Sequence, residues 1–301
     1  LWVLMSSLGI GPGDEVIVPG FTFVASMSSI IYTGASPVLA EVDDTFNLDP
    51  VDVESRITAK TKAILAVHML GAPCDLDALK DIADRNGLLL IEDAAQAFGG
   101  SYHGRKLGSI GVGGAFSFNI YKTITCGDGG MIVTDDDSVY EQCFALHDQG
   151  HLPLRKGVEV GNRPFLGLNF RMNEVSAAVL NVQMNRLDHI IGTLRANRSA
   201  LRRAIHGIPG VGFRRLVDPD GDLATHLVVI LPTAEVAAAM AADLGTKTLS
   251  KSGWHVYANM EHLLQRRVVS GFSRTVADAG AAALDPVTGD TDLNDALPNA
   301  W

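Results

Sequence analysis

Three polar residues that can act on a carbonyl or an amine lie in one stretch of the chain. Asp93 and Gln96 follow the apolar run Leu88–Ile91, and Lys122 stands between the strand-like segment Phe116–Phe118 and a glycine-rich turn. A lysine amine can form an imine with a carbonyl carbon, and a carboxylate can keep a nearby nitrogen protonated. This stretch therefore suggests that Lys122 carries pyridoxal phosphate as a Schiff base, with Asp93 facing its pyridine nitrogen.

The same chemistry needs groups that bind a phosphate and cover the ring of the cofactor. Ser117, in the segment before the lysine, offers a hydroxyl for the phosphate. Phe23 offers an aromatic face for the ring, and Gln96 is placed to reach the ring hydroxyl. A helix N-terminus is a further phosphate site in many proteins, and we expect the segment that supplies it to precede Leu1.

Each of these residues also has a purely structural interpretation. Most lysines lie on the surface, and an aspartate after a strand is more often a turn or helix-capping residue. Phe23 fits a hydrophobic core, and Ser117 fits a residue that satisfies a backbone group. His68 is more often a packing residue at a strand end than a catalyst. Residue types and spacing alone therefore leave the cofactor site as one interpretation among several.

The surrounding sequence alternates between short apolar runs and amphipathic segments. We expect strands at 15–18, 37–42, 63–67, 88–91, 116–118 and 131–134, and helices at 23–32, 51–57, 75–86 and 138–147. This alternation predicts an α/β fold with a mostly parallel, mixed sheet between layers of helices. Ligands bind at the carboxyl ends of the strands in such sheets, and Asp93 stands at one of these ends.

The pattern changes in the second half of the chain. Helices are expected at 173–185 and 187–205, and beyond the Ile208-Pro209-Gly210 turn we expect strands at 211–214 and 226–231 and a helix at 236–244. We therefore predict a large cofactor-binding domain over residues 1–188, lacking part of its N-terminal segment, and a smaller α+β domain over residues 189–301.

A polar-aromatic cluster lies in the second predicted domain. It consists of Trp254, His255 and Tyr257. A half-buried strand with alternating side chains explains this cluster better than the wall of a sugar pocket does.

The composition restricts the class of protein. The chain has 301 residues, a net charge of −10 with dispersed acidic residues, and three cysteines. It shows no basic stripe for nucleic acid, and no apolar run reaches the roughly 18 residues that span a bilayer. Without a CxxC pair, neither a disulfide framework nor a metal site is expected. We expect a cytoplasmic protein that binds small molecules rather than nucleic acid or membrane.

Five segments occur in an order that resembles the DegT/DnrJ/StrS family of sugar aminotransferases. They are IGPGDEVIVPGFTFVAS, VHMLGAPCDLDAL, IEDAAQAFGGSYHGRKLGSIG, AFSFNIYKTITCGDGGMIVTDD and GLNFRMNEVSAAVLNVQMNRLD. The resemblance is nearly continuous from Leu8 to about Leu201. It implies the fold type I (aspartate aminotransferase-like) architecture. It also implies transfer of an amino group from an amino acid, glutamate or glutamine, to a keto- or aldehydo-sugar through pyridoxal phosphate and its pyridoxamine form.

The resemblance implies a role for each matched residue near the ring. Lys122 matches the Schiff-base lysine, Asp93 the partner of the pyridine nitrogen, and Gln96 the residue near the ring hydroxyl. The dehydratase branch of the family has histidine in place of the lysine, so Lys122 favours transamination. Asn119 stands where many members have histidine, which is a departure from the family pattern.

The remaining matches concern the phosphate and the subunit interface. Ser117 matches a phosphate ligand, and Thr22-Phe23 match the pair beside the cofactor, with the aromatic residue over the ring. Asn169 matches an asparagine that reaches the phosphate of the neighbouring subunit. This last match implies a homodimer with shared active sites.

Within the family, some motifs favour one branch, and two rival functions remain open. FSFNIYKTITCGDGG, the HDQGH loop and VDPDGD most resemble the branch that aminates C8 of 3-deoxy-octulosonate. The first rival is a pyridoxal-phosphate enzyme of another reaction type, such as elimination, dehydration or coupling in natural-product biosynthesis. The second rival is a non-catalytic relative that binds a ligand. Addition of the amino donor alone should change the cofactor spectrum only in a transaminase.

Overall fold

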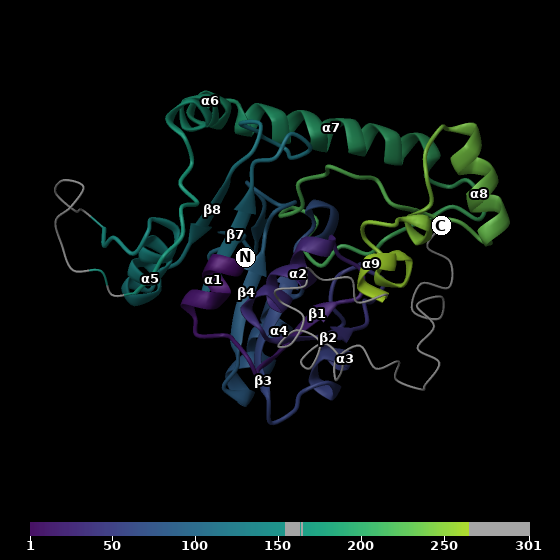
Figure 1. The fold of residues 1–301 in the computed structure, drawn as a ribbon. Helices are drawn as coiled ribbons and strands as arrows, with labels where there is room; N and C mark the ends of the chain where they lie inside the picture. The colour runs from purple at the N-terminus through teal and green to yellow at the C-terminus, as the bar shows by residue number, and fades with distance from the viewer. Residues whose placement is uncertain (154–162, 164, 265–301) are drawn as a thin grey trace.

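The computed structural model describes residues 1–153, 163 and 165–264. A six-stranded sheet forms the centre, in the strand order β2-β1-β3-β4-β7-β8 (Figure 1). Neighbouring strands are parallel except β7 and β8, which are antiparallel. The strands are β1 (Glu15–Pro19), β2 (Ser36–Ala40), β3 (Thr61–Val67), β4 (Leu89–Asp93), β7 (Gly113–Ser117) and β8 (Gly130–Val133). The predicted α/β fold with a mostly parallel, mixed sheet is confirmed.

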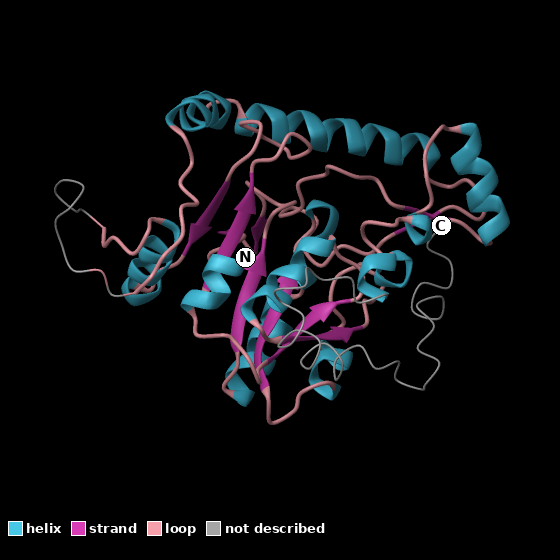
Figure 2. Cartoon of the chain, viewed as in Figure 1, coloured by secondary structure: helices cyan, strands magenta, loops and turns pink. Residues whose placement is uncertain are grey.

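Helices cover both faces of this sheet, as Figure 2 shows. One face packs against α1 (Trp2–Ser7), α2 (Val24–Thr33) and α5 (Asp137–His147), and the other against α3 (Pro50–Ser55) and α4 (Leu76–Asn86). Because side chains alternate along a strand, each strand serves both cores. On β3, for example, Leu65 belongs to the first core and Ile64 to the second.

The sequence sets the bounds of α4 and thereby the position of β4. Asp75 caps the N-terminus of this helix, since its Oδ1 accepts from the N–H of Ala78 at 3.1 Å. Gly87 ends the helix in the left-handed conformation, with φ of 65°. The strand follows two residues later and carries Asp93 to its carboxyl end.

The alternation along β4 also separates two neighbouring carboxylates. Asp93 shares a sheet face with Ile91, toward α1 and α2, whereas Glu92 points to the α3 and α4 side. There the Nε2 of His68 donates to Glu92 Oε2 at 3.0 Å, and the His68 Nδ1 accepts from the N–H of Cys74. Both side chains are completely buried. His68 therefore lies away from the Asp93 face, in the packing role rather than the catalytic one.

Glu92 also fixes the chain that leads into β7. Its oxygens accept from the backbone N–H groups of Gly108, Ile110 and Gly111 at 2.6–2.7 Å. Burial acts to raise the pKa of Glu92, but the hydrogen bonds from His68 and from these backbone groups outweigh burial, and the pKa is lowered. The carboxylate thus holds β4 and the start of β7 in register.

The C-terminal part begins with two consecutive helices. These are α6 (Glu174–Met184) and α7 (Leu187–Ile205), which lie along the top of the molecule in Figure 1. The antiparallel strands β9 (Gly212–Phe213) and β10 (Val229–Ile230) and the helices α8 (Ala234–Asp243) and α9 (Glu261–Leu264) follow. A short hairpin of β5 (Ser101–Tyr102) and β6 (Arg105–Lys106) precedes β7.

Two sequence expectations for this part are wrong. The strand expected at 226–231 pairs only at Val229–Ile230, and the chain just before it, at Leu223 and Thr225, bonds to the turn after β3. The cluster of Trp254, His255 and Tyr257 lies in turns and a short 3-10 helix rather than in a strand.

The predicted boundary between residues 188 and 189 stays a prediction, and residues 265–301 of the second predicted domain lie outside the described residues. Leu223 and Val256 from the C-terminal part are buried in the two cores of the sheet. Among the described residues, no helix has the length and apolar character that would let it cross a bilayer.

Glu92→Gln should lower the free energy of unfolding by about 2–4 kcal/mol, because an amide NH2 replaces an oxygen that accepts backbone N–H groups. Because the folded pKa of Glu92 is lowered, the carboxylate stabilises the fold above the unfolded pKa of about 4.3. This contribution is lost as the pH falls through the folded pKa. Urea unfolding of the wild-type chain and of Glu92→Gln, at neutral and acidic pH, measures the difference in the free energy of unfolding. Glu54→Gln, at an exposed carboxylate, is the control and should have little effect; equal losses in the two variants would contradict this role.

Candidate functional site

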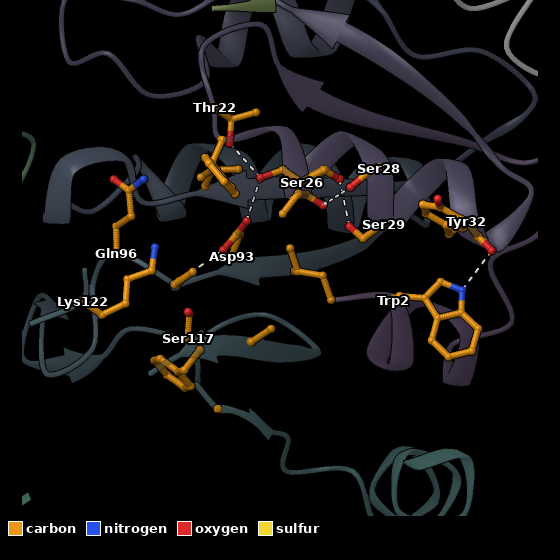
Figure 3. A pocket seen from close by; sticks show the side chains of 18 of the residues that line it. Trp2, Thr22, Ser26, Ser28, Ser29, Tyr32, Asp93, Gln96, Ser117 and Lys122 are labelled. Atoms are coloured by element: carbon orange, nitrogen blue, oxygen red, sulfur yellow. Dashed lines mark hydrogen bonds between the residues drawn. The ribbon is translucent and has the colours of Figure 1, made fainter. Parts of the chain in front are cut away.

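A cavity of about 630 Å³ lies at the carboxyl ends of β3, β4 and β7. Asp93, Ser117 and Lys122 project toward this space from three different segments (Figure 3). The wall holds all of the residues predicted from the sequence except Asn169: Thr22, Phe23, Asp93, Gln96, Ser117 and Lys122. The sheet topology therefore brings together side chains that are far apart in the sequence.

Asp93 is oriented by hydrogen bonds from two segments. The Ser26 hydroxyl of α2 donates to Asp93 Oδ2 at 2.8 Å, and the N–H of Ala95 donates to Oδ1 at 3.1 Å. Because Ser26 has one hydroxyl proton, its oxygen must accept from Thr22 Oγ1, which lies 2.7 Å away. The carboxylate is 5% exposed and is held in one position at the cavity wall.

Ser26 is a site residue that sequence reasoning missed. It stands in the motif TFVAS, in which the sequence singles out only Thr22 and Phe23. The available signal was the spacing: hydroxyls at positions i and i+4 at the start of a helix fall on the same side of it. This spacing makes Thr22 and Ser26 a continuous link to Asp93.

The turn that presents Lys122 is closed by Asn119. The Lys122 N–H donates to the carbonyl of Asn119 at 3.0 Å, and the Asn119 Nδ2 donates to Asp128 Oδ1 at 2.7 Å. Burial lowers the pKa of the Lys122 amine, although the charge of Asp93 acts to raise it. A larger share of the amine is therefore neutral than in a solvated lysine, as nucleophilic attack on a carbonyl requires.

The wall of the cavity fits pyridoxal phosphate. Lys122 and Asp93 supply an amine and a carboxylate, Phe23 an aromatic face, and Ser117 a hydroxyl. The volume lies within the range of about 300–1,000 Å³ that is usual for small-molecule sites. These residues suit a planar ring with a basic nitrogen, an aldehyde and a phosphate.

A C-terminal segment supports the Thr22-Phe23 pair from outside. The N–H of Thr22 donates to the carbonyl of His255 at 2.8 Å. The Phe23 ring stacks on Trp254, with 6.1 Å between ring centroids and 23° between planes. Neither Trp254 nor His255 is among the residues that form the cavity wall. Trp254 and His255 therefore help to position Phe23 without forming part of the cavity wall.

Asn169 is the predicted site residue that lies outside the cavity. Its side chain is exposed, and its Oδ1 accepts from the N–H of Arg171 at 3.3 Å. Its neighbours Leu168 and Phe170 do line the cavity. The residue thus lies next to the cavity wall in the chain without being part of it.

Comparison with known proteins identifies close relatives. The model of the DegT/DnrJ/EryC1/StrS aminotransferase family matches residues 1–263. GDP-perosamine synthase of Caulobacter vibrioides is 46% identical over 189 residues, which are 62% of this chain and 50% of the relative. The dTDP-3-amino-3,4,6-trideoxy-alpha-D-glucose transaminase of Streptomyces venezuelae is 40% identical over 232 residues, which are 76% and 59% of the two chains. The chain thus spans between half and three fifths of the length of these relatives.

Another relative is named as a regulatory protein rather than as an enzyme. The pleiotropic regulatory protein of Geobacillus stearothermophilus is 40% identical over 210 residues, which are 69% of this chain and 55% of the relative.

Solved structures share the fold. DesV of Streptomyces venezuelae, in complex with a ketimine intermediate, has a TM-score of 0.77 and 35% identity, covering 92% of this chain and 74% of that chain. A Streptococcus pneumoniae protein described as a sugar aminotransferase, in its PLP form, has a TM-score of 0.72 and 25% identity, covering 81% and 68%.

The pH dependence of Lys122 acylation, measured in the protein without cofactor, should report the lowered pKa of its amine. Because burial lowers its pKa, the acylation rate should reach half its maximum at a pH below the value of about 10.4 for a free lysine. Asp93→Asn should move this midpoint further down, since it removes the charge that acts to raise the pKa. Limited acylation followed by peptide mass spectrometry measures both midpoints. Lys62 is exposed and serves as the internal control; a Lys122 midpoint that does not respond to Asp93→Asn would contradict the pairing.

Proposed function

Because this chain belongs to the DegT/DnrJ/EryC1/StrS aminotransferase family, we propose that it is a pyridoxal-phosphate-dependent transaminase acting on a carbonyl sugar. The observation that carries the proposal is the convergence of Lys122 and Asp93 on one cavity from separate segments. One relative is named a transaminase for an amino sugar linked to dTDP, which supports a sugar as the acceptor. The amino donor in this proposal is glutamate or glutamine, and the octulosonate branch stays a prediction.

Asp93 and Lys122 have different roles in the proposed reaction. Pyridoxal phosphate, when bound, supplies an electron sink for the carbon that carries the amino group. Asp93, held by Ser26 and Ala95, presents a carboxylate oxygen that keeps a ring nitrogen protonated. Lys122 would hold the cofactor through its side-chain amine, and the same amine, when free, would take the proton from the α-carbon of the donor.

The binding residues orient the ring and the acceptor. Phe23 covers one face of the ring, and its contact with Trp254 limits its rotation. Ser117 offers its hydroxyl to the phosphate, and Gln96 offers its amide to the ring hydroxyl. In this arrangement Phe23 would shield one face of the ring and leave the other to the amine of Lys122 and to the substrate.

Exposed apolar side chains support a homodimer. In α6 no residue is buried, although its sequence EVSAAVLNVQM is largely apolar, and Val175 is 76% exposed. Leu166 is 93% exposed and Tyr121 is 87% exposed. Surfaces of this kind are usually covered by another protein, and a second copy is the commonest partner. Asn169 stands in the chain between Leu166 and α6 and is itself exposed, so we propose that it reaches the site of the partner chain.

We further propose a cytoplasmic location. The cysteines of the described residues, Cys74, Cys126 and Cys143, are free and buried. Free thiols are typical of proteins from a reducing compartment, which supports the proposal.

A ligand-binding regulatory protein is the second candidate function. It is favoured by the relative named a pleiotropic regulatory protein. Such a protein would bind pyridoxal phosphate with the same residues but would not complete an amino transfer. Loading the protein with cofactor and adding glutamate without acceptor separates the two functions, because only a transaminase yields 2-oxoglutarate and the pyridoxamine form.

Lys122→Ala should reduce sugar amination by about 10³-fold or more, because it removes both the amine that holds the cofactor and the base. The variant should still bind the pyridoxamine form, whose amine needs no lysine. Steady-state amination and equilibrium binding measure the two properties. Lys106→Ala, at an exposed lysine of β6, is the matched control and should keep full activity. Near-normal turnover by the Lys122 variant would refute its assigned role.

Mixed dimers should show whether active sites are shared. Inactive Lys122→Ala and Asn169→Ala chains, when refolded together, should recover about a quarter of the wild-type activity. Half of the dimers would be mixed, and each mixed dimer would have one intact site. Lys122→Ala mixed with Asp93→Asn is the control, because both residues belong to the same chain at each site and no activity should return. Equal recovery in the two mixtures, or none in either, would exclude a contribution of Asn169 across the interface.

A further inference from the structure

The side-chain amide of Gln96 has one permitted orientation. The backbone N–H of Leu70 donates to Gln96 Oε1 at 2.8 Å. A backbone N–H cannot accept a hydrogen bond, so the oxygen of the amide must face Leu70. The Nε2 group has no acceptor among the described residues, and Gln96 lines the cavity beside Lys122 (Figure 3). Toward a ligand, Gln96 therefore acts as a donor and not as an acceptor.

The turn that holds Gln96 is strained. Residues 69–71 follow β3, and Leu70 adopts the left-handed conformation, with φ of 58° and ψ of 26°. Residues with a Cβ rarely adopt this conformation, and it persists only where surrounding contacts impose it. A Cβ on Gly71, which has φ of 83°, would lie 2.8 Å from Thr225 Oγ1 and 3.3 Å from the carbonyl oxygen of Gln96. The turn is thus in close contact with both Thr225 and Gln96.

Hydrogen bonds from the C-terminal part impose this conformation. Thr225 Oγ1 donates to the carbonyl of Leu70 at 2.8 Å, and the N–H of Leu223 donates to the carbonyl of Gly71 at 3.0 Å. Because the single proton of the Thr225 hydroxyl goes to Leu70, Oγ1 must accept from His226 Nδ1, which lies 2.9 Å away. Thr225 is therefore fixed on both sides.

Arg214 acts on the peptide group that donates to Gln96. Its Nη1 donates to the carbonyl of Met69 at 3.2 Å, and this carbonyl shares a peptide group with the N–H of Leu70. Arg214 is 8% exposed, and its Nη2 lies 3.9 Å from the buried Asp222. A cation on the carbonyl side polarises the peptide and strengthens its N–H as a donor, and the same effect passes on to the Gln96 amide.

We infer that Thr225 and Arg214 are positioning residues that act through the 69–71 turn to make Gln96 a fixed, polarised donor for an anionic oxygen of the ligand. The inference rests on the proposed function, in which that oxygen is the ring hydroxyl oxygen of pyridoxal phosphate in its deprotonated form. A donor stabilises an oxygen more strongly when the oxygen is charged. The C-terminal part thereby contributes to cofactor binding without touching the cofactor.

Cofactor binding by a double-variant cycle tests the coupling. Thr225→Val keeps the shape of the side chain but removes the hydroxyl, and it should raise the Kd of the apoprotein for pyridoxal phosphate about three- to tenfold. Gln96→Ala should raise the Kd at least as much. In the Gln96→Ala background, Thr225→Val should have no further effect, because its contribution passes through the amide. Thr225→Ser, which restores the hydroxyl, should return the Kd to within about twofold of wild type.

Thr134→Val is the matched control, since the Thr134 hydroxyl also donates to a backbone carbonyl, that of Val112, at 2.7 Å. It should leave the Kd unchanged. Circular dichroism reports whether each variant folds, and Arg214→Lys replaces Thr225→Val in the cycle if the latter does not fold. Additive effects in the double variant, or an equal rise in Kd for Thr134→Val, would overturn the coupling between Thr225 and Gln96 but not the proposed function. Failure of the wild-type chain to bind pyridoxal phosphate would overturn both the coupling and the proposed function.

Discussion

The site depends on the hydrogen bond from Ser26 to Asp93, because this contact fixes a buried carboxylate at the carboxyl end of β4. It joins the first turn of α2 to the central sheet across 67 positions of the chain. The bond fixes Asp93 Oδ2, and the Ala95 N–H holds the other oxygen. This carboxylate already accepts two hydrogen bonds from the protein. Only its remaining lone pairs can accept a hydrogen bond from a ligand. The position of this carboxylate at the cavity wall therefore follows from α2.

The pleat of β4 points two adjacent acidic side chains to opposite faces of the sheet, where they have different roles. Glu92 is enclosed by His68 and by the backbone N–H groups that lead into β7, so its carboxylate maintains the sheet. Asp93, one residue further, faces the other layer and the cavity. The amide of Gln96 is held in the same manner, by a turn that the C-terminal part stabilises. Structural contacts therefore hold Asp93 and Gln96, while both side chains still line the cavity.

Much of this arrangement could be predicted from the sequence, because strands buried on both faces give continuous apolar runs and because parallel strands align their carboxyl ends. The run Leu88–Ile91 predicted the position of Asp93 for this reason. Contacts between distant segments could not be predicted. The role of Ser26 depends on a partner 67 positions away, and Thr225, just before the expected strand at 226–231, bonds to Leu70, 155 positions away. Trp254 and His255 alternate as in a strand, yet they pack against Phe23 from turns.

The most direct test of the account is to identify the amine that holds the cofactor. Borohydride reduction of the chain loaded with pyridoxal phosphate fixes the cofactor to that amine, and peptide mass spectrometry then locates the modified residue. If Lys122 holds the cofactor, the peptide that contains Lys122 should be modified, and this modification should fall markedly when Asp93 is replaced by alanine. Modification of an exposed lysine such as Lys60 or Lys106, with Lys122 unmodified, would contradict this assignment.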